Sequence, residues 1–501
     1  MYLSDMHKVW LATGSERIYL EPSMANRHGL IAGATGTGKT VTLKVLAESF
    51  SDMGVPVFVA DIKGDLSGMC KPGKENKHIR RSIDTMGLSD FTYTPYPVQF
   101  WDVYGKQGLP VRTTVSEMGP ELLARLLGLN DTQKGVLRIV FRIADDKQLL
   151  LIDLKDLRSM LRFVGDNAAE YKLTYGNISA QSIGAIQRAL LTLEDDGGTL
   201  FFGEPDLQLQ DWIEWSEDGR GVMNILECNE LFQHPLLYGT FLLWMLSEIY
   251  EMLPEAGDLD KPKLAFFFDE AHLLFNDAPK ALVEKVEQVV RLIRSKGVSV
   301  WFITQNPSDI PDSVLGQIGN RVQHALRAYT PNDQKALRAA ANSFRVNPEF
   351  DTEEVIQALG VGEAVLSVLD EDGVPSIVER ANILPPRSSM NAVDDVTLQA
   401  QILASPLKEK YATAEDRESA HEVLTEEQEA AEQAEQEAKE KAEKEAEKKA
   451  KEKEKAKKKS SSKSTRKKSS ALQKAVNSTA NTIGREIGKK LVRGLFDTLL
   501  K

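Results

Sequence analysis

A glycine-rich segment near the start of the chain limits the folds that the sequence can adopt. It fits the pattern G-x-x-x-x-G-K-[ST], which is carried by Gly33, Ala34, Thr35, Gly36, Thr37, Gly38, Lys39 and Thr40. The apolar run 29–32 precedes it, and a helix is expected from Lys39 to Phe50. A strand, a glycine turn and a helix in this order aim several backbone N–H groups and a positive helix end at one point. The segment therefore predicts an α/β fold with a phosphate-binding loop.

The residue types of this loop also suggest the ligand. Lys39 is expected to reach the β- and γ-phosphates of a nucleotide, and the Thr40 hydroxyl is expected to ligate Mg²⁺. The glycines let the main chain approach the phosphates without a Cβ clash. ATP and Mg²⁺ are therefore the expected cofactors, and an accidental glycine turn is the alternative.

Hydrolysis needs acidic groups at a strand end, and one later segment offers them. Residues 264–268 form an unbroken apolar run, as expected for a central parallel strand, and Asp269 and Glu270 follow it. We expect Asp269 to hold Mg²⁺ through water and Glu270 to orient and deprotonate the attacking water. The simpler alternative is a strand that merely stops at two acids.

Two further apolar runs end in polar residues. Residues 55–60 lead into Asp61, and residues 298–303 lead into Thr304 and Gln305. Ligands of parallel sheets lie outside the carboxyl ends of the strands, where a sensor of the γ-phosphate should be. Gln305 is the preferred candidate because an amide can touch both phosphate and water, whereas Asp61 could equally cap the turn that follows it.

Together, residues 28–33, 61–65, 268–272 and 303–307 resemble the HerA and FtsK superfamily of ring-forming ATPases. The resemblance is nearest to the bacterial HerA-like helicase family and covers roughly residues 16–385. It implies a RecA-like core with a mainly parallel sheet, ATP hydrolysis, and a hexameric ring that threads duplex DNA.

The same resemblance implies an arginine that reaches the nucleotide of the neighbouring subunit. By position the candidates are Arg321 and Arg327, and a surface ion pair is the alternative for each. HerA-type translocases carry a barrel domain before the phosphate loop. Only 32 residues precede Gly33, so we expect a hairpin from Val9 to Leu20 instead of a barrel.

The residues Asp269, Glu270, Ala271 and His272 also spell the DEAH signature of another helicase class. Proteins of that class act as monomers and use two tandem RecA-like lobes. Residues 330–400 offer neither the length nor the residues for a second lobe, which disfavours this alternative.

Charge is unevenly distributed along the chain. The formal net charge is −12, but residues 426–501 carry 21 basic against 14 acidic residues, so the body of the chain is strongly acidic. This disfavours tight static binding to DNA, because neutralising phosphates needs clustered Lys and Arg. Basic residues lining the pore of a ring, multiplied by symmetry, remain compatible with an acidic exterior.

Other sequence features indicate the cellular compartment in which the protein is expected. The two cysteines, Cys70 and Cys228, argue for a reducing compartment. The N-terminus lacks an export signal, so a cytoplasmic protein is expected. The apolar segment Pro235 to Leu253 is interrupted by polar residues and predicts a buried helix, not an integral membrane span.

The sequence divides into five expected segments. They are a first part of the ATPase core (1–112), a mostly helical insertion (113–215), a second part of the core (216–400), a charged helical or disordered linker (401–470), and a basic amphipathic helix (471–501). The core is expected to close with a hairpin of residues 364–369 and 374–378.

Residues 426–459 predict a single solvated helix that lacks the apolar seam of a coiled coil. Its expected i,i+4 ion pairs are Glu435/Lys439, Glu437/Lys441, Glu440/Lys444 and Glu445/Lys449. The helix at 471–501 could dock on the ring, on DNA or a protein partner, or on a membrane surface.

These observations favour an ATP-hydrolysing, ring-forming motor that translocates or unwinds DNA and assembles with copies of itself. The alternative is a nucleotide-switched assembly or interaction ATPase without a nucleic-acid substrate, which the acidic body supports.

Overall fold

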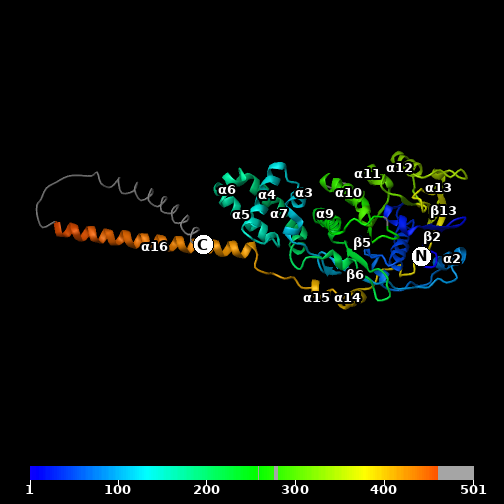
Figure 1. The fold of residues 1–501 in the computed structure, drawn as a ribbon, viewed down its shortest axis with the longest axis horizontal. Helices are drawn as coiled ribbons and strands as arrows, with labels where there is room; N and C mark the ends of the chain where they lie inside the picture. The colour runs from blue at the N-terminus through cyan, green and yellow to red at the C-terminus, as the bar shows by residue number, and fades with distance from the viewer. Residues whose placement is uncertain (258, 276–279, 461–501) are drawn as a thin grey trace. The chain divides into compact units, whose positions relative to one another are not determined.

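The computed structural model describes residues 1–257, 259–275 and 280–460 (Figure 1). Residues 1–420 form one compact unit, and the described residues from His421 onward belong to a second. The predicted basic helix 471–501 and the segment 461–470 lie outside the described residues.

A single mixed sheet forms the centre of the first unit. Its strands are β1 (Tyr2–Leu3), β2 (Lys8–Thr13), β3 (Arg17–Leu20), β4 (Gly29–Ala32), β5 (Val57–Asp61), β6 (Val98–Asp102), β7 (Leu109–Pro110), β8 (Met223–Glu227), β9 (Leu264–Phe268), β10 (Val298–Thr304), β11 (Asn320–His324), β12 (Glu363–Ser367) and β13 (Glu379–Ile383). The strand order is β1-β2-β13-β12-β11-β4-β10-β9-β5-β8-β6-β7, and β3 pairs with β2. The expected α/β class with a mainly parallel sheet is confirmed.

Parallel pairing extends from β11 through β4, β10, β9, β5, β8 and β6 to β7. Residues of β4, β5, β9 and β10 are all buried, as expected for strands covered on both faces. Parallel neighbours place their carboxyl ends on the same edge of the sheet. The polar residues that follow β5, β9 and β10 therefore meet at the edge where the glycine loop follows β4.

The other side of the sheet is antiparallel. The expected hairpin of Val9 to Leu20 is present as β2 and β3. The expected closing hairpin is correct in its first strand and in its turn, where Asp370 N donates to Val374 O over 3.0 Å. Its second strand is wrong in its bounds, because β12 pairs with β13 at 379–383, while residues 374–378 contact the end of the first strand through the hydrogen bond from Ser376 N to Val368 O over 2.9 Å. Pro375, which lacks an N–H, makes only an isolated bridge with Leu369.

The segment between β7 and β8 is mostly helical, as predicted. Its helices are α3 (Val115–Leu126), α4 (Asp131–Asp146), α5 (Leu154–Asp166), α6 (Ala168–Tyr175), α7 (Ala180–Leu193) and α8 (Thr199–Phe201). Thr114, Asn130 and Asp153 accept hydrogen bonds at the starts of α3, α4 and α5, which satisfies N–H groups that a helix leaves free. Helix α3 packs on α9 (Pro235–Met252) and α10 (Lys280–Ile293), so the insertion rests on helices of the core.

The remaining helices are α1 (Lys39–Asp52), α2 (Lys77–Met86), α11 (Asp312–Leu315), α12 (Pro331–Asn342), α13 (Thr352–Ala358), α14 (Asp395–Ala404), α15 (Lys408–Tyr411) and α16 (Ala420–Ser460). Helix α9 is largely buried, as predicted for this apolar segment. No described helix combines the length and the apolar character that crossing a bilayer requires.

Helix α16 in the second unit has the predicted character. Its side chains are largely exposed as far as Lys453, and all four predicted i,i+4 ion pairs are present. Each exposed pair of this kind contributes about 0.3–0.5 kcal/mol, so the pairs add modestly to the stability of the helix.

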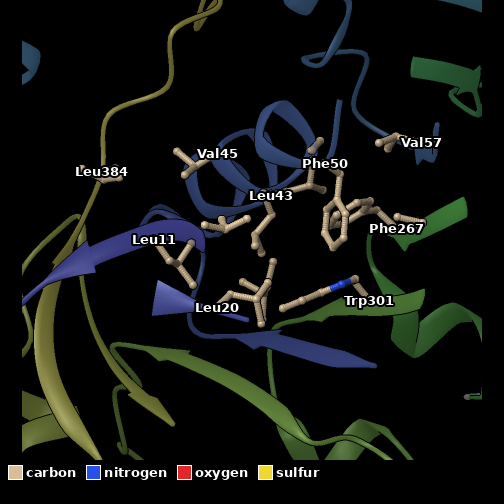
Figure 2. Close-up of a cluster of buried hydrophobic side chains, with 14 of the residues drawn as sticks. Leu11, Leu20, Leu43, Val45, Phe50, Val57, Phe267, Trp301 and Leu384 are labelled. Atoms are coloured by element: carbon tan, nitrogen blue, oxygen red, sulfur yellow. The ribbon is translucent and has the colours of Figure 1, made fainter. Parts of the chain in front are cut away.

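Helix α1 lies on the sheet and packs its apolar face against it. Figure 2 shows Leu43 and Phe50 of α1 pointing toward Trp301 and Phe267 of the central strands. The ring centroids of Phe50 and Phe267 are 5.9 Å apart in an edge-to-face arrangement. The first turn of α1, which follows the glycine loop, is therefore fixed relative to the parallel strands.

A second face of α1 carries buried charges at i,i+4 spacing. Lys44 donates to Asp65 O and Ser389 O over 3.0 and 2.9 Å. Glu48 accepts from the backbone N–H groups of Arg387 and Ser388 over 2.8 and 2.9 Å. These hydrogen bonds attach the segment after β13 to α1. The helix therefore contacts the sheet on one face and this segment on another.

The packing of α1 predicts a large effect for one truncation. Leu43 is 1% exposed in the core, so Leu43→Ala should lower the free energy of unfolding by about 2–5 kcal/mol. Leu173 is 98% exposed, so Leu173→Ala should change it by less than about 0.5 kcal/mol. Urea unfolding followed by tryptophan fluorescence checks both. Equal effects of the two substitutions would contradict the described core.

Candidate functional site

The glycine loop connects β4 to α1 and requires glycine at several positions. Gly33, Gly36 and Gly38 have φ values of 152°, 76° and 118°. A Cβ atom on Gly33 would lie 2.5 Å from the Cβ of His324, a separation that real Cβ atoms do not show. The loop can therefore adopt this path only with a glycine at residue 33.

Lys39 lies across this loop. Its side chain is buried, and its Nζ donates to the carbonyl oxygens of Gly33 and Ala34 over 2.7 and 3.1 Å. Burial lowers the pKa of Lys39, while the negative charge of Glu270 acts in the opposite direction. The ammonium group is thus held beside the loop, at the first turn of α1, where it can bind a phosphate. Thr40 follows it on α1 and is half-buried.

Residues next to β11 and β12 form backbone hydrogen bonds with the glycine loop. Ala34 N donates to Ala325 O over 2.8 Å, and Gly362 N donates to Thr37 O over 3.0 Å. His324 Nδ1 lies 2.9 Å from Glu363 O, and its Nε2 lies 2.8 Å from the Thr42 hydroxyl.

The contacts of His324 define its tautomer. A carbonyl can only accept, so Nδ1 carries the proton and Nε2 accepts from Thr42. Burial lowers the pKa of His324 to about 4. No sequence signal identifies this histidine, because its contacts with the loop come from residues far apart in the chain.

Asp269 and Glu270 follow β9 at the same edge of the sheet. Asp269 is buried, and its Oδ1 accepts from the backbone N–H of Glu270 over 2.9 Å. Burial raises the pKa of Asp269 to about 6, against the lowering effect of the Lys63 charge. Glu270 has a φ of 47°, a left-handed backbone conformation that is uncommon for a residue with a side chain.

Two donors contact the Glu270 carboxylate. Lys63 Nζ lies 2.6 Å from Oε1, and Gln305 Nε2 donates to Oε2 over 3.3 Å. Burial alone would raise the pKa of Glu270, but Lys63 and Gln305 together hold it below its usual value. The structure therefore brings Gln305 to Glu270 at the edge of the sheet where both were expected, a contact that the sequence did not predict. It also adds Lys63, a residue to which the sequence analysis assigned no role.

Asp61 and Thr304, the other polar residues at this edge, form hydrogen bonds within their own turns. The buried carboxylate of Asp61 accepts from the N–H groups of Lys63, Gly64 and Leu66 over 3.2, 2.8 and 2.8 Å. Burial raises its pKa to about 7. Thr304 donates its hydroxyl hydrogen to Asp309 Oδ2 over 2.8 Å. Of the two alternatives that the sequence left open for Asp61, the structure shows the turn cap.

The two arginine candidates find acceptors within their own chain. Arg321 is half-buried and donates to Ser343 O and Leu315 O over 3.1 and 3.0 Å. Arg327 donates to Gln357 O and, over 3.1 Å, to Leu359 O. Neither arginine pairs with an acid, so the ion-pair alternative is not what the described contacts show. Their action on a neighbouring subunit remains a prediction.

The candidate metal ligands at this edge are oxygen atoms. The Thr40 hydroxyl and the Asp269 carboxylate are hard ligands of the kind that Mg²⁺ prefers. Among the described residues, no group of three or more His, Cys, Asp or Glu side chains could hold a metal ion by itself. Mg²⁺ is usually bound by one or two protein groups together with substrate phosphates and water.

Comparisons with known proteins agree with the resemblance of the motifs. The family described as "Helicase HerA-like C-terminal" matches residues 7–501. The DNA double-strand break repair helicase HerA of Saccharolobus solfataricus is 21% identical over 343 residues. The match covers 68% of this chain and 61% of that relative, so the chain spans less than two thirds of the relative's length.

Solved structures with related shapes include the plasmid coupling protein TrwB in complex with an ATP analogue. Its TM-score is 0.49 at 16% identity, with 78% of this chain and 93% of that chain covered. VirB4 of Thermoanaerobacter pseudethanolicus gives a TM-score of 0.48 at 16% identity and covers 76% of this chain and 98% of that chain. At these values, the fold assignment depends on the strand order and on the family match.

The close approach of Gly33 to His324 predicts a sensitive position in the loop. Gly33→Ala would force the loop or His324 to move, so affinity for a fluorescent ATP analogue should fall about tenfold or more. Gly184→Ala in α7 is the matched control, because a Cβ there meets only Arg188 Nη1 at 3.6 Å. Unchanged affinity of Gly33→Ala, measured by fluorescence anisotropy, would show that nucleotide does not bind at this loop.

Proposed function

Since the chain belongs to the HerA-like C-terminal helicase family of P-loop ATPases, we propose that it is a Mg²⁺-dependent ATPase that works as a ring-forming motor on DNA. The observation that supports this most is the arrangement of one sheet edge. Parallel pairing aligns Ala32 with Thr304, and Phe268 with Phe302, so the glycine loop, Gln305 and the two acids follow neighbouring strands.

The chain's own groups supply what phosphoryl transfer requires. The loop N–H groups and Lys39 bind and orient the phosphates, and their positive charge stabilises the negative charge that develops on the transferred group. Thr40 and Asp269 are the proposed ligands of Mg²⁺, which, when bound, neutralises phosphate charge. Glu270 accepts the proton of the attacking water, for which its lowered pKa keeps it charged near neutral pH.

Gln305 is proposed to report the state of the nucleotide. Its amide already donates to Glu270 over 3.3 Å, and it follows β10, which pairs with β4 ahead of the glycine loop. An amide in this position can contact both the water that Glu270 orients and the terminal phosphate. Loss of the γ-phosphate would therefore change the contacts at the end of β10.

Ring formation is proposed from the family and from the separation of Arg321 and Arg327 from the carboxylates of their own chain. Within the part of the chain that the structure describes, both guanidinium groups donate to carbonyl oxygens and pair with no carboxylate, which would be a stronger partner. If one of them turned toward the nucleotide of a neighbouring subunit, it would stabilise the transition state of hydrolysis. Such an arginine raises the rate by about 10³- to 10⁵-fold.

A second candidate function keeps ATP hydrolysis without a nucleic acid. The acidic character of the chain before residue 426 favours it, because DNA binding requires clustered basic residues. In this alternative, nucleotide binding and release switch the protein between states that recruit a protein partner.

Substitution of two site residues should separate binding from hydrolysis. Lys39→Ala should lose both nucleotide affinity and turnover, since it removes the buried cation of the loop. Glu270→Gln keeps the shape of the side chain, so nucleotide binding should remain while the hydrolysis rate falls by about 10²- to 10⁴-fold. Nucleotide binding by calorimetry and phosphate release check this. A fully active Glu270→Gln variant would remove Glu270 from the mechanism.

Stimulation by DNA distinguishes the two candidate functions. The ATPase rate of the full chain should rise when duplex or single-stranded DNA is added at low salt, and added salt should reverse the rise. Elution as an oligomer from a sizing column with nucleotide present should accompany it. An ATPase rate that is indifferent to both forms of DNA would favour the assembly ATPase over the motor.

A further inference from the structure

The contacts of Lys63 form a group that the proposed mechanism does not use. Its ammonium nitrogen lies 2.6 Å from Oε1 of Glu270 and 3.8 Å from Oδ2 of Asp269. Its side chain is 42% exposed, whereas those of Glu270 and Asp269 are 10% and 6% exposed. A half-exposed lysine thus reaches in to face two buried carboxylates at the candidate catalytic edge.

The turn after β5 places this lysine. Strands β5 and β9 pair in parallel, with Ala60 aligned to Phe268, so the turns that follow them are neighbours. The Asp61 carboxylate accepts from the N–H groups of Lys63, Gly64 and Leu66 and so fixes the backbone of the turn.

Gly64 lets the chain bend at this turn, with a φ of 71° and with Asn229 Nδ2 only 2.8 Å from where its Cβ would be. The buried acid and this glycine therefore build the turn, and the residue that the turn presents to Glu270 is Lys63.

The contacts of Glu270 show what this lysine does. Glu270 stands in a left-handed backbone conformation at the end of β9, and its side chain needs fixed partners to keep one orientation. Gln305 contacts Oε2 at 3.3 Å, a long hydrogen bond, and His272 Nδ1 also lies 3.3 Å from Oε2 without a hydrogen bond. The charge-assisted contact of Lys63 with Oε1 is the shortest of the three.

We propose that Lys63 is a positioning residue for ATP hydrolysis, whose ammonium group holds the Glu270 carboxylate in the orientation that activates water. This inference rests on the proposed function. Lys63 acts through Glu270, in the way that outer partners orient catalytic groups in other sites, where their loss typically costs about 10- to 100-fold in activity. Nucleotide binding, which depends on the glycine loop and Lys39, does not require it.

A comparison of two substitutions tests this role. Lys63→Met keeps much of the apolar stem and removes the charge, so kcat for ATP should fall about 10- to 100-fold while KM and the affinity for a non-hydrolysable ATP analogue stay within about twofold. Lys63→Arg restores a cation and should recover much of the lost kcat. If Lys63 had only a structural role, Lys63→Met would change nucleotide affinity or thermal stability. Lys63→Arg would then not recover kcat alone.

Lys106→Met is the matched control. Lys106 Nζ pairs with Glu230 Oε1 at 2.8 Å on the surface, outside the candidate site, and its substitution should leave kcat unchanged. An active wild-type protein whose Lys63→Met variant keeps or exceeds the wild-type kcat would overturn the positioning role. A wild-type protein without ATPase activity would instead overturn the proposed function, and this inference with it.

Discussion

The parallel hydrogen bonding of β4, β10, β9 and β5 is the constraint on which the rest of the structure depends. It brings the carboxyl ends of four strands to one edge. The residues that follow these strands are far apart in the chain, since Gly33 and Gln305 lie more than two hundred positions from each other. If these strands were not aligned, the glycine loop could still bind phosphate, but no acid would lie near it. The two acids after β9 would then stand at an ordinary strand end. Burial of the strands on both faces makes this alignment stable.

The electrostatics of the edge follow from this crowding. Burial raises the pKa of Asp61 and of Asp269, and the negative charges of Asp269 and Glu270 respectively add to these shifts. Glu270 differs because the ammonium of Lys63 offsets the cost of its burial. One cation is thus shared by two carboxylates, and it favours the charged form of the one proposed to activate water.

Much of this arrangement could be predicted from the sequence, because the apolar runs and the glycine loop are local signals. The runs before Gly33 and Asp269 mark their strands directly. The second strand of the closing hairpin could not be placed, because its pairing depends on Pro375 and on partners in β12 and β2. Lys63 and His324 were missed for a related reason. A lysine or histidine acquires its role from side chains that only the fold brings near, whereas Lys39 belongs to a motif.

We propose that a nucleotide binds with its phosphates between the glycine loop and the acids that follow β9. A structure of the full chain with Mg²⁺ and a non-hydrolysable ATP analogue tests it most directly. We expect the terminal phosphate within hydrogen-bond reach of Lys39 Nζ, with the metal bound by Thr40 and, through water, by Asp269, and with Glu270 facing the phosphate. Nucleotide bound elsewhere on the chain, or a terminal phosphate out of reach of Lys39 and both acids, would contradict it.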